Sequence, residues 1–202
     1  MQTWIGKDEN AWVEKAWTWI HQNIKPGQRV FLPAGGTPTP LYRRFCQEAS
    51  DPLLRSLRFV QIDEIMDGPQ KGFFRHYFEK ELAPFREQIE WIERGDQAAD
   101  VAILGVGVNG HVAFHEPGLP RGFTSGCVRL SAETLGYLHL TRPTWGITYG
   151  VSAFQNAKKI LVLAQGQAKQ TILRRALKQD HDLPISWILQ HSDVTLISDF
   201  EL

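Results

Sequence analysis

Residues Asp100–Gly118 read DVAILGVGVNGHVAFHEPG, and this stretch decides the fold. It begins with a continuous apolar run, Val101–Leu104, which is typical of a strand buried on both faces of a sheet. Glycines and polar side chains follow at Gly105, Gly107, Asn109, Gly110, His111, His115 and Glu116. A buried strand that delivers titratable groups onto a glycine-rich turn is how open α/β sheets build active sites.

Strand and helix patterns alternate along the rest of the chain. Strands are predicted at residues 29–34, 57–62, 101–104, 159–164 and 194–198, with shorter strand-like pieces at 127–130 and 146–150. Helices are predicted at 8–24, from 38 onward, and at 73–82, 151–157, 166–177 and 183–190. The alternation predicts an α/β fold, a mainly parallel, Rossmann-like open sheet flanked by helices on both faces. We expect residues 1–202 to form a single domain.

The composition points to a local site for a small molecule. Lys plus Arg and Asp plus Glu each count 22, so no net charge favours nucleic acid or an anionic membrane. No apolar run approaches the roughly 18–20 residues that cross a bilayer. Cys46 and Cys127 have neither metal nor redox spacing, and the first residues resemble no signal peptide. We therefore expect a cytoplasmic protein, and the sequence leaves open whether copies associate into a homo-oligomer.

Three tryptophans in the first predicted helix allow two interpretations. Trp12, Trp17 and Trp19 could form a stacking surface for bases or sugars. Trp12 and Trp19, however, recur with Ala16 and Ile20 at helical spacing. An apolar helix face packed on a sheet is the favoured interpretation.

A second glycine turn lies at Gly35-Gly36-Thr37-Pro38, between a predicted strand and a predicted helix. The glycines allow the backbone to approach a ligand, while the free amides of a helix start point toward it. Thr37 is expected as the N-cap and Pro38 as the first helical residue. The turn is therefore a candidate phosphate-binding loop; a well-capped tight turn is the alternative.

Other candidate groups lie elsewhere in the chain. Asp63 and Glu64 follow a predicted strand, so they are either catalytic carboxylates or a surface pair that caps the next helix. The Gly- and Pro-rich residues 119–126 are a candidate mobile lid. Lys169 is expected in the first turn of the helix at 166–177.

Two familiar sites fit the opening stretch poorly. Gly105, Gly107 and Gly110 satisfy G-x-G-x-x-G, but Pro117 and Gly118 follow too soon for the long helix of a dinucleotide site. His111, His115 and Glu116 could form a metal site, yet the same helix-breaking residues weaken that hypothesis. We predict neither a cofactor nor a metal.

The stretch LGVGVNGHVAFHEPG resembles the signature of the glucosamine-6-phosphate deaminase/isomerase family, LGxGxDGHIAFNEP. FLPAGGTPTPLY resembles the phosphate loop of this family, QIDEI its Asp-Glu element, and AQGQAK its segment with a phosphate-binding lysine. The related 6-phosphogluconolactonases generally continue Asp-Gly-His-Thr-Ala-Ser. Val112–Phe114 and Glu116–Gly118 therefore favour the deaminase branch.

The resemblance implies a role for each matched residue. Gly35, Gly36, Thr37 and Lys169 would bind the phosphate of a sugar phosphate. The catalytic set would be Asp63, which moves a proton between C2 and C1, His111, which opens the sugar ring, Glu116, which orients His111, and Asn109. The products would be a ketose phosphate and ammonia.

The chain also departs from the family pattern. Asn109 replaces an aspartate, so it can hold His111 by a hydrogen bond but cannot stabilise an imidazolium by charge. His115 replaces an asparagine, which predicts different substrate contacts. A phosphate-binding arginine has only Arg129 and Arg142 as candidates. Two further functions stay open, hydrolysis of a sugar-phosphate lactone and a sugar-phosphate binding protein with impaired catalysis, as does a gluco or galacto substrate.

Overall fold

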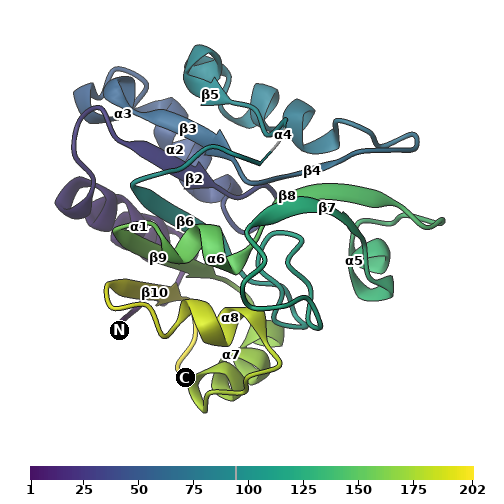
Figure 1. The fold of residues 1–202 in the computed structure, drawn as a ribbon. Helices are drawn as coiled ribbons and strands as arrows, with labels where there is room; N and C mark the ends of the chain where they lie inside the picture. Colours follow the sequence, from purple (N-terminus) through teal and green to yellow (C-terminus); the bar gives the residue numbers. More distant parts are fainter. Residues whose placement is uncertain (94) are drawn as a thin grey trace.

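The computed structural model describes residues 1–93 and 95–202. Within this part of the chain, parallel strands form one large sheet in the order β1-β10-β9-β6-β2-β3-β5 (Figure 1). The strands are β1 (Gln2–Ile5), β2 (Arg29–Leu32), β3 (Arg58–Gln61), β5 (Ile89–Glu90), β6 (Val101–Gly105), β9 (Lys159–Ala164) and β10 (Val194–Ser198). The predicted α/β fold with a mainly parallel sheet is confirmed.

Helices cover both faces of this sheet (Figure 1). One layer contains α1 (Glu9–Asn23), α2 (Thr39–Gln47), α3 (Pro52–Ser56) and α4 (Phe73–Glu81), and the other contains α6 (Val151–Gln155), α7 (Gln170–Leu177) and α8 (Pro184–Ile188). Alternation along β2 supplies both cores, because Val30 and Leu32 pack toward the first layer and Phe31 toward the second. Short 3-10 turns lie at Ala83–Gln88 and Gln167–Lys169. None of the helices described is long and apolar enough to cross a membrane.

The strand order changes direction between β2 and β6. From β2 the chain proceeds through β3 to β5 at one edge, whereas from β6 it proceeds through β9 to β10 on the other side. Loops that leave the carboxyl ends of two such strands diverge to opposite faces and leave a crevice between them. The loop after β2 carries Gly35–Thr37, and the loop after β6 carries Asn109–Glu116.

A second, antiparallel sheet contains β4 (Asp63–Ile65), β8 (Trp145–Tyr149) and β7 (Ser125–Arg129). The strand-like pieces predicted at 127–130 and 146–150 belong to it. Asp63 follows the strand predicted at 57–62, as expected, and it also begins a further strand, β4, in which it pairs with Thr148. The small sheet has its own apolar cluster, which consists of Ile65, Phe74, Phe114, Val128 and Leu130. Burial of this cluster explains why the chain re-enters a strand at Asp63.

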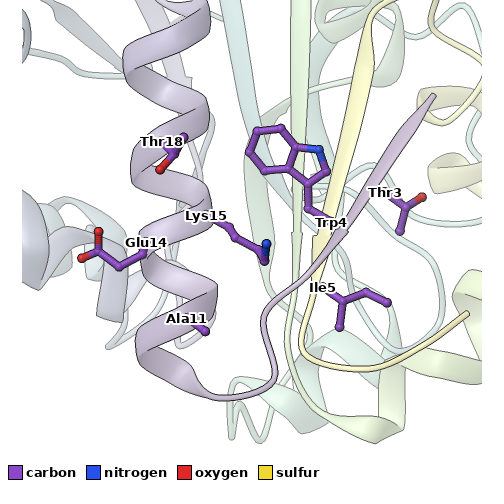
Figure 2. A pocket seen from close by; sticks show the side chains of 7 residues that line it. All are labelled: Thr3, Trp4, Ile5, Ala11, Glu14, Lys15 and Thr18. Atoms are coloured by element: carbon purple, nitrogen blue, oxygen red, sulfur yellow. The ribbon is translucent and has the colours of Figure 1, made fainter.

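The tryptophans of α1 are mostly core residues. Trp12 and Trp19 are 0% and 2% exposed, and the Nε1–H of Trp19 donates to Thr195 Oγ1 at 2.9 Å. The interpretation of α1 as a helix packed on the sheet is confirmed for these two residues. Trp4 and Lys15 face a groove of about 620 Å³ between β1 and α1 (Figure 2). The residues that line this groove include none of the predicted site residues.

Candidate active site

The predicted site residues follow four neighbouring strands at the carboxyl edge of the large sheet. Gly35–Thr37 follow β2, Asp63 follows β3, Asn109–Glu116 follow β6 and Lys169 follows β9. Lys169 Nζ donates to the hydroxyl of Thr37 at 2.7 Å, which joins the loop after β9 to the loop after β2, on either side of β6. The structure thus brings residues from distant parts of the sequence to one edge of the sheet.

The loop after β6 folds into tight turns. The amide of Gly107 donates to the carbonyl of His111 at 3.0 Å, and the amide of Gly110 donates to the carbonyl of Gly107 at 3.0 Å. Gly110 has a φ of +87°, and a Cβ on Gly107 would lie 2.3–2.5 Å from the ring of His111. The glycines therefore allow His111 to pack directly on backbone. These turns occupy the place of the helix that a dinucleotide-binding motif requires.

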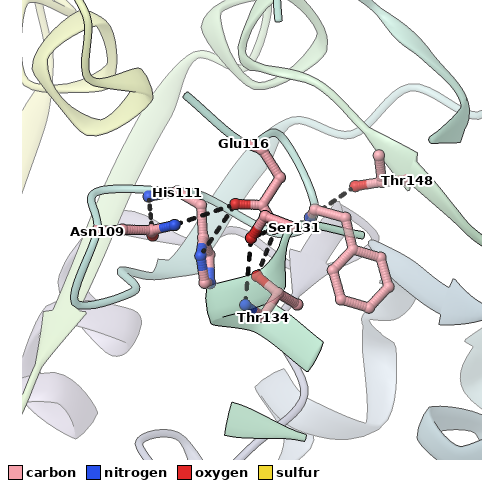
Figure 3. Close-up of polar contacts among 7 residues, drawn as sticks. Asn109, His111, Glu116, Ser131, Thr134 and Thr148 are labelled. Carbon is pink, nitrogen blue, oxygen red and sulfur yellow. Dashed lines mark hydrogen bonds and ion pairs between the residues drawn. The ribbon is translucent and has the colours of Figure 1, made fainter. Parts of the chain in front are cut away.

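His111, Asn109 and Glu116 form the centre of this loop (Figure 3). His111 Nδ1 lies 3.6 Å from Glu116 Oε2, and Asn109 Nδ2 donates to the same carboxylate oxygen at 3.2 Å. The contact of Asn109 with His111 is to the backbone, because Asn109 Oδ1 accepts from the His111 amide at 3.1 Å. Asn109 therefore fixes the turn and Glu116, and Glu116 is the carboxylate that faces the imidazole.

Two residues outside every sequence motif also contact Glu116 (Figure 3). The hydroxyl of Ser131 donates to Glu116 Oε1 at 3.0 Å, and the hydroxyl of Thr134 donates to the same oxygen. Both belong to α5 (Ala132–Tyr137) or its N-cap, in the connection between β7 and β8. Ser131 is a residue type favoured at helix N-caps, but nothing in the sequence indicates that Ser131 or Thr134 contacts Glu116.

The electrostatic environment of His111 is mixed. Burial lowers the pKa of His111, the charge of Lys169 lowers it further, and Glu116 acts in the opposite direction. His111 is therefore poised as a neutral base near neutral pH.

The adjacent acids Asp63 and Glu64 occupy different environments. Glu64 accepts hydrogen bonds from the amides of Phe74 at 3.0 Å and Arg75 at 2.6 Å, so it caps the start of α4. Asp63 is 7% exposed, and within the described residues its Oδ1 has no hydrogen-bond partner. Burial, and then the charge of Glu64, raise the pKa of Asp63 well above the ordinary carboxyl range. The surroundings of Asp63 thus favour its protonated form, which makes it a candidate for proton transfer.

The glycine turn after β2 differs in detail from the prediction. Helix α2 begins at Thr39, with Pro38 at the N-cap position, so Thr37 is neither the cap nor helical. Gly35 has a φ of +110°, and its carbonyl accepts from the hydroxyls of Thr39 and Tyr77, each at 2.9 Å. The Thr37 hydroxyl does not cap the helix and instead accepts from Lys169 Nζ. Thr39 and Tyr77 hold the turn from outside the predicted set.

Lys169 lies in the 3-10 turn at Gln167–Lys169, directly before α7, rather than in the first turn of one long helix. Burial lowers the pKa of Lys169 to about 8, against the opposing effect of Asp199. Asp199 itself accepts from the amide of Gly166 at 3.0 Å. Near neutral pH this buried ammonium supplies a positive charge beside Thr37, as an anion-binding site requires.

His115 is a core residue. It is 0% exposed, its Nδ1 accepts from the amide of Val151 at 3.0 Å, and its Nε2 lies 3.4 Å from the carbonyl of Leu119. These contacts leave neither ring nitrogen free for a metal or a substrate. Within residues 1–93 and 95–202, no cluster of three or more His, Cys, Asp or Glu could hold a metal ion.

The two candidate arginines lie on the small sheet or beside it. Arg129 pairs with Trp145 at the end of β7. The guanidinium of Arg142 lies beside Gly68, in the connection between β4 and α4. Both side chains are exposed, and neither contact involves the loops that carry Thr37 and Lys169.

A family model and individual relatives match this chain, and both kinds of match name glucosamine-6-phosphate isomerases or deaminases. Residues 59–197 match the family model for glucosamine-6-phosphate isomerases/6-phosphogluconolactonase. A glucosamine-6-phosphate deaminase of Lactobacillus johnsonii is 29% identical over 98% of this chain and 95% of its own length. That of Enterococcus faecalis is 28% identical over 92% and 91%.

Two solved structures share the fold. A monomeric glucosamine-6-phosphate deaminase aligns with a TM-score of 0.83 at 22% identity, covering 98% of this chain and 97% of its own. The 6-phosphogluconolactonase of Thermotoga maritima aligns with a TM-score of 0.73 at 20% identity, covering 98% of each chain.

Proposed function

Because the chain belongs to the glucosamine-6-phosphate isomerase/6-phosphogluconolactonase family, we propose that it is a glucosamine-6-phosphate deaminase-like enzyme. It converts an amino-sugar 6-phosphate and water into a ketose 6-phosphate and ammonia. The relatives that match over nearly the whole chain are named as deaminases, which supports this branch of the family.

The phosphate is bound at the Gly35–Thr37 turn. Lys169 provides the ammonium, 2.7 Å from the Thr37 hydroxyl, and both groups can donate to phosphate oxygens. The turn at Gly35, held by Thr39 and Tyr77, lets the backbone approach the anion closely. This end of the crevice fixes the substrate so that its sugar carbons extend toward the loop after β6.

His111 opens the sugar ring as an acid–base group, with Glu116 as its charged partner. Asp63, in its ionised form, then removes the proton from C2 of the open-chain aldose and returns it to C1, while a second proton moves from the amine nitrogen to O1. The C1 aldehyde thereby becomes an alcohol and the C2 amine becomes an imine, which water hydrolyses to the ketone and ammonia. Acid–base steps of this kind each contribute about 10²–10⁴-fold to the rate.

The observation that carries this proposal is the presence of two separate titratable groups, Asp63 and the His111–Glu116 pair, after the two strands that flank β2. Asp63 follows β3 and His111 follows β6, and both of these strands pair with β2. Hydrolysis of a lactone requires only one base that activates water. An aldose–ketose conversion needs a second group that carries a proton between carbons, and buried Asp63 suits that role.

The test compares ammonia release from glucosamine 6-phosphate with hydrolysis of 6-phosphogluconolactone, in the wild type and Asp63→Asn. We expect ammonia release from the wild type and its loss in the variant. Lactone hydrolysis that survives Asp63→Asn, without ammonia release, would establish the lactonase instead. The third possible outcome is a binding protein whose catalysis is impaired because Asn109 replaces an aspartate. Such a protein would be stabilised thermally by glucosamine 6-phosphate and would turn over neither substrate.

A further inference from the structure

The carboxylate of Glu116 is held by donors on both of its oxygens. Oε1 accepts from the hydroxyls of Ser131 and Thr134, whereas Oε2 accepts from Asn109 and faces His111 Nδ1 at 3.6 Å. Glu116 is 6% exposed. Its orientation is therefore set by protein groups rather than by bulk water.

The hydrogen-bond directions at α5 are determined by the chemistry of the groups. The hydroxyl oxygen of Ser131 accepts from the amide of Thr134 at 3.1 Å, so its hydrogen is available for Glu116. Thr134 is 2% exposed and its hydroxyl also donates to Glu116. An ionised carboxylate only accepts hydrogen bonds, which makes it the matching partner for both hydroxyls.

We propose that Ser131 and Thr134 are positioning residues for the reaction, which hold Glu116 turned toward His111 and make α5 a structural part of the acid–base site. This inference rests on the proposed function, because it concerns the step assigned to His111. A glutamate side chain has several rotatable bonds, and a carboxylate held at only one oxygen can rotate away from the imidazole. The two hydroxyls remove that freedom.

A purely structural role for the hydroxyls would have a different signature. In that case they would only satisfy a buried carboxylate, and their loss would reduce stability while leaving the charge that His111 experiences unchanged. In the positioning role, loss of Thr134 displaces Glu116, and the titration of His111 changes with it. Titration of His111 therefore separates the two roles without substrate.

The first experiment follows the titration of His111 by NMR in the substrate-free protein, comparing wild type, Thr134→Val and Glu116→Gln. Since Glu116 holds the pKa of His111 up against burial, Glu116→Gln should lower that pKa. We expect Thr134→Val to lower it part of the way. Thr144→Val is the matched control, because Thr144 is 3% exposed in the same connection and donates to the carbonyl of Arg142. A Thr134→Val titration that matches Thr144→Val, or that moves upward, would overturn the proposal.

The second experiment measures deaminase kinetics of the same variants. We expect kcat to fall about tenfold in Thr134→Val with KM within about twofold, since the phosphate site is untouched. Thr134→Ser retains the hydroxyl and should recover most of the loss, whereas Thr144→Val should behave as wild type. If kcat falls in Thr134→Val and is just as low in Thr134→Ser, the hydroxyl of residue 134 is not what positions Glu116. If neither the wild type nor any variant releases ammonia, the proposed function is wrong. The NMR titration of His111 still tests whether Thr134 positions Glu116, because it needs no substrate.

Discussion

The ammonium nitrogen of Lys169 lies 2.7 Å from the hydroxyl oxygen of Thr37, although the two residues are 132 positions apart in the sequence. The contact connects the loop after β9 with the loop after β2, on either side of β6. It places a partly buried positive charge beside a glycine turn whose backbone can approach an anion. Several testable consequences depend on this edge of the sheet.

Lys169 should give the reaction a basic limb in its pH dependence. Its pKa is lowered to about 8, so the ammonium is present below that pH and is lost above it. We expect kcat/KM to fall, by up to about tenfold per pH unit, as the pH rises past this value. Lys169→Arg keeps its charge and should remove this limb. A wild-type KM that stays constant between about pH 7 and pH 9.5 would contradict the assignment.

Gly107→Ala should disable the acid–base site. An added Cβ would lie 2.3–2.5 Å from the ring of His111, so the imidazole must move. A displacement of about 1 Å can cost about 10²-fold, and we expect kcat/KM to fall by that order. Gly105→Ala is the control, because its Cβ meets no atom of the described residues within 4 Å. Equal kinetics in the two variants would show that the position of His111 does not matter.

Asn109→Asp should make His111 more basic at a cost in stability. The amide nitrogen of Asn109 lies 3.2 Å from Glu116 Oε2, so an aspartate there would set two carboxylates side by side. The added charge should raise the pKa of His111 and move the acidic limb of kcat/KM to higher pH. Repulsion should lower the free energy of unfolding by about 1 kcal/mol, or roughly 2–4 °C in Tm. An acidic limb that does not move would exclude electrostatic coupling at this position.

Asp63 and Glu64 should respond oppositely to substitution. Glu64→Ala removes the carboxylate that accepts from the amides of Phe74 and Arg75, and should cost about 1–2 kcal/mol in urea unfolding at pH 7. The raised pKa of Asp63 means that its ionisation is unfavourable in the folded state. Asp63→Asn should therefore unfold at no lower urea concentration than wild type, yet lose ammonia release. Loss of stability in both variants alike would remove the distinction between them.

His115 should make the folded protein sensitive to mild acid. Burial lowers its pKa below the ordinary 6.5, whereas the unfolded chain titrates near that value. The unfolded state therefore binds more protons as the pH falls through 6.5, and the free energy of unfolding decreases there. His115→Asn should reduce the difference between the urea midpoints at pH 7 and pH 5. His111→Asn should show how much of that difference comes from His111, whose pKa is also lowered. An identical difference in wild type and His115→Asn would reject this source.

The large sheet and the loop after β6 could be predicted because their signals are local. An apolar run such as Lys159–Ala164 and the glycines after Leu104 specify a strand and a turn without reference to the rest of the chain. The start of β4 could not be predicted from the sequence. A strand of three residues is too short to show an alternation of apolar and polar residues, and its pairing with Thr148 depends on a distant part of the chain. Strand β1 has only four residues, and its burial pattern does not alternate.

The candidate site was predictable only where sequence motifs carry it. His111, Glu116 and Lys169 lie in such motifs, whereas Ser131 and Thr134 reach Glu116 through the placement of α5, which depends on the small sheet. The cap position of Thr37 was wrongly predicted, because α2 begins at Thr39, Pro38 occupies the N-cap position and no side chain caps the helix. Local propensity does not fix the first residue of a helix to within one or two positions.

The pairing of β1 with β10 has a consequence for how the protein is made. Gln2 aligns with Thr195 and Ile5 with Ser198, so an early segment of the chain completes its sheet only against a very late one. During synthesis the β1 residues stay unpaired until β10 has left the ribosome. Pairings at such sequence separation form slowly and expose strand edges in the meantime. The order of translation therefore differs from the order in which the sheet can close, because β1 finds its partner only after β10 has been synthesised.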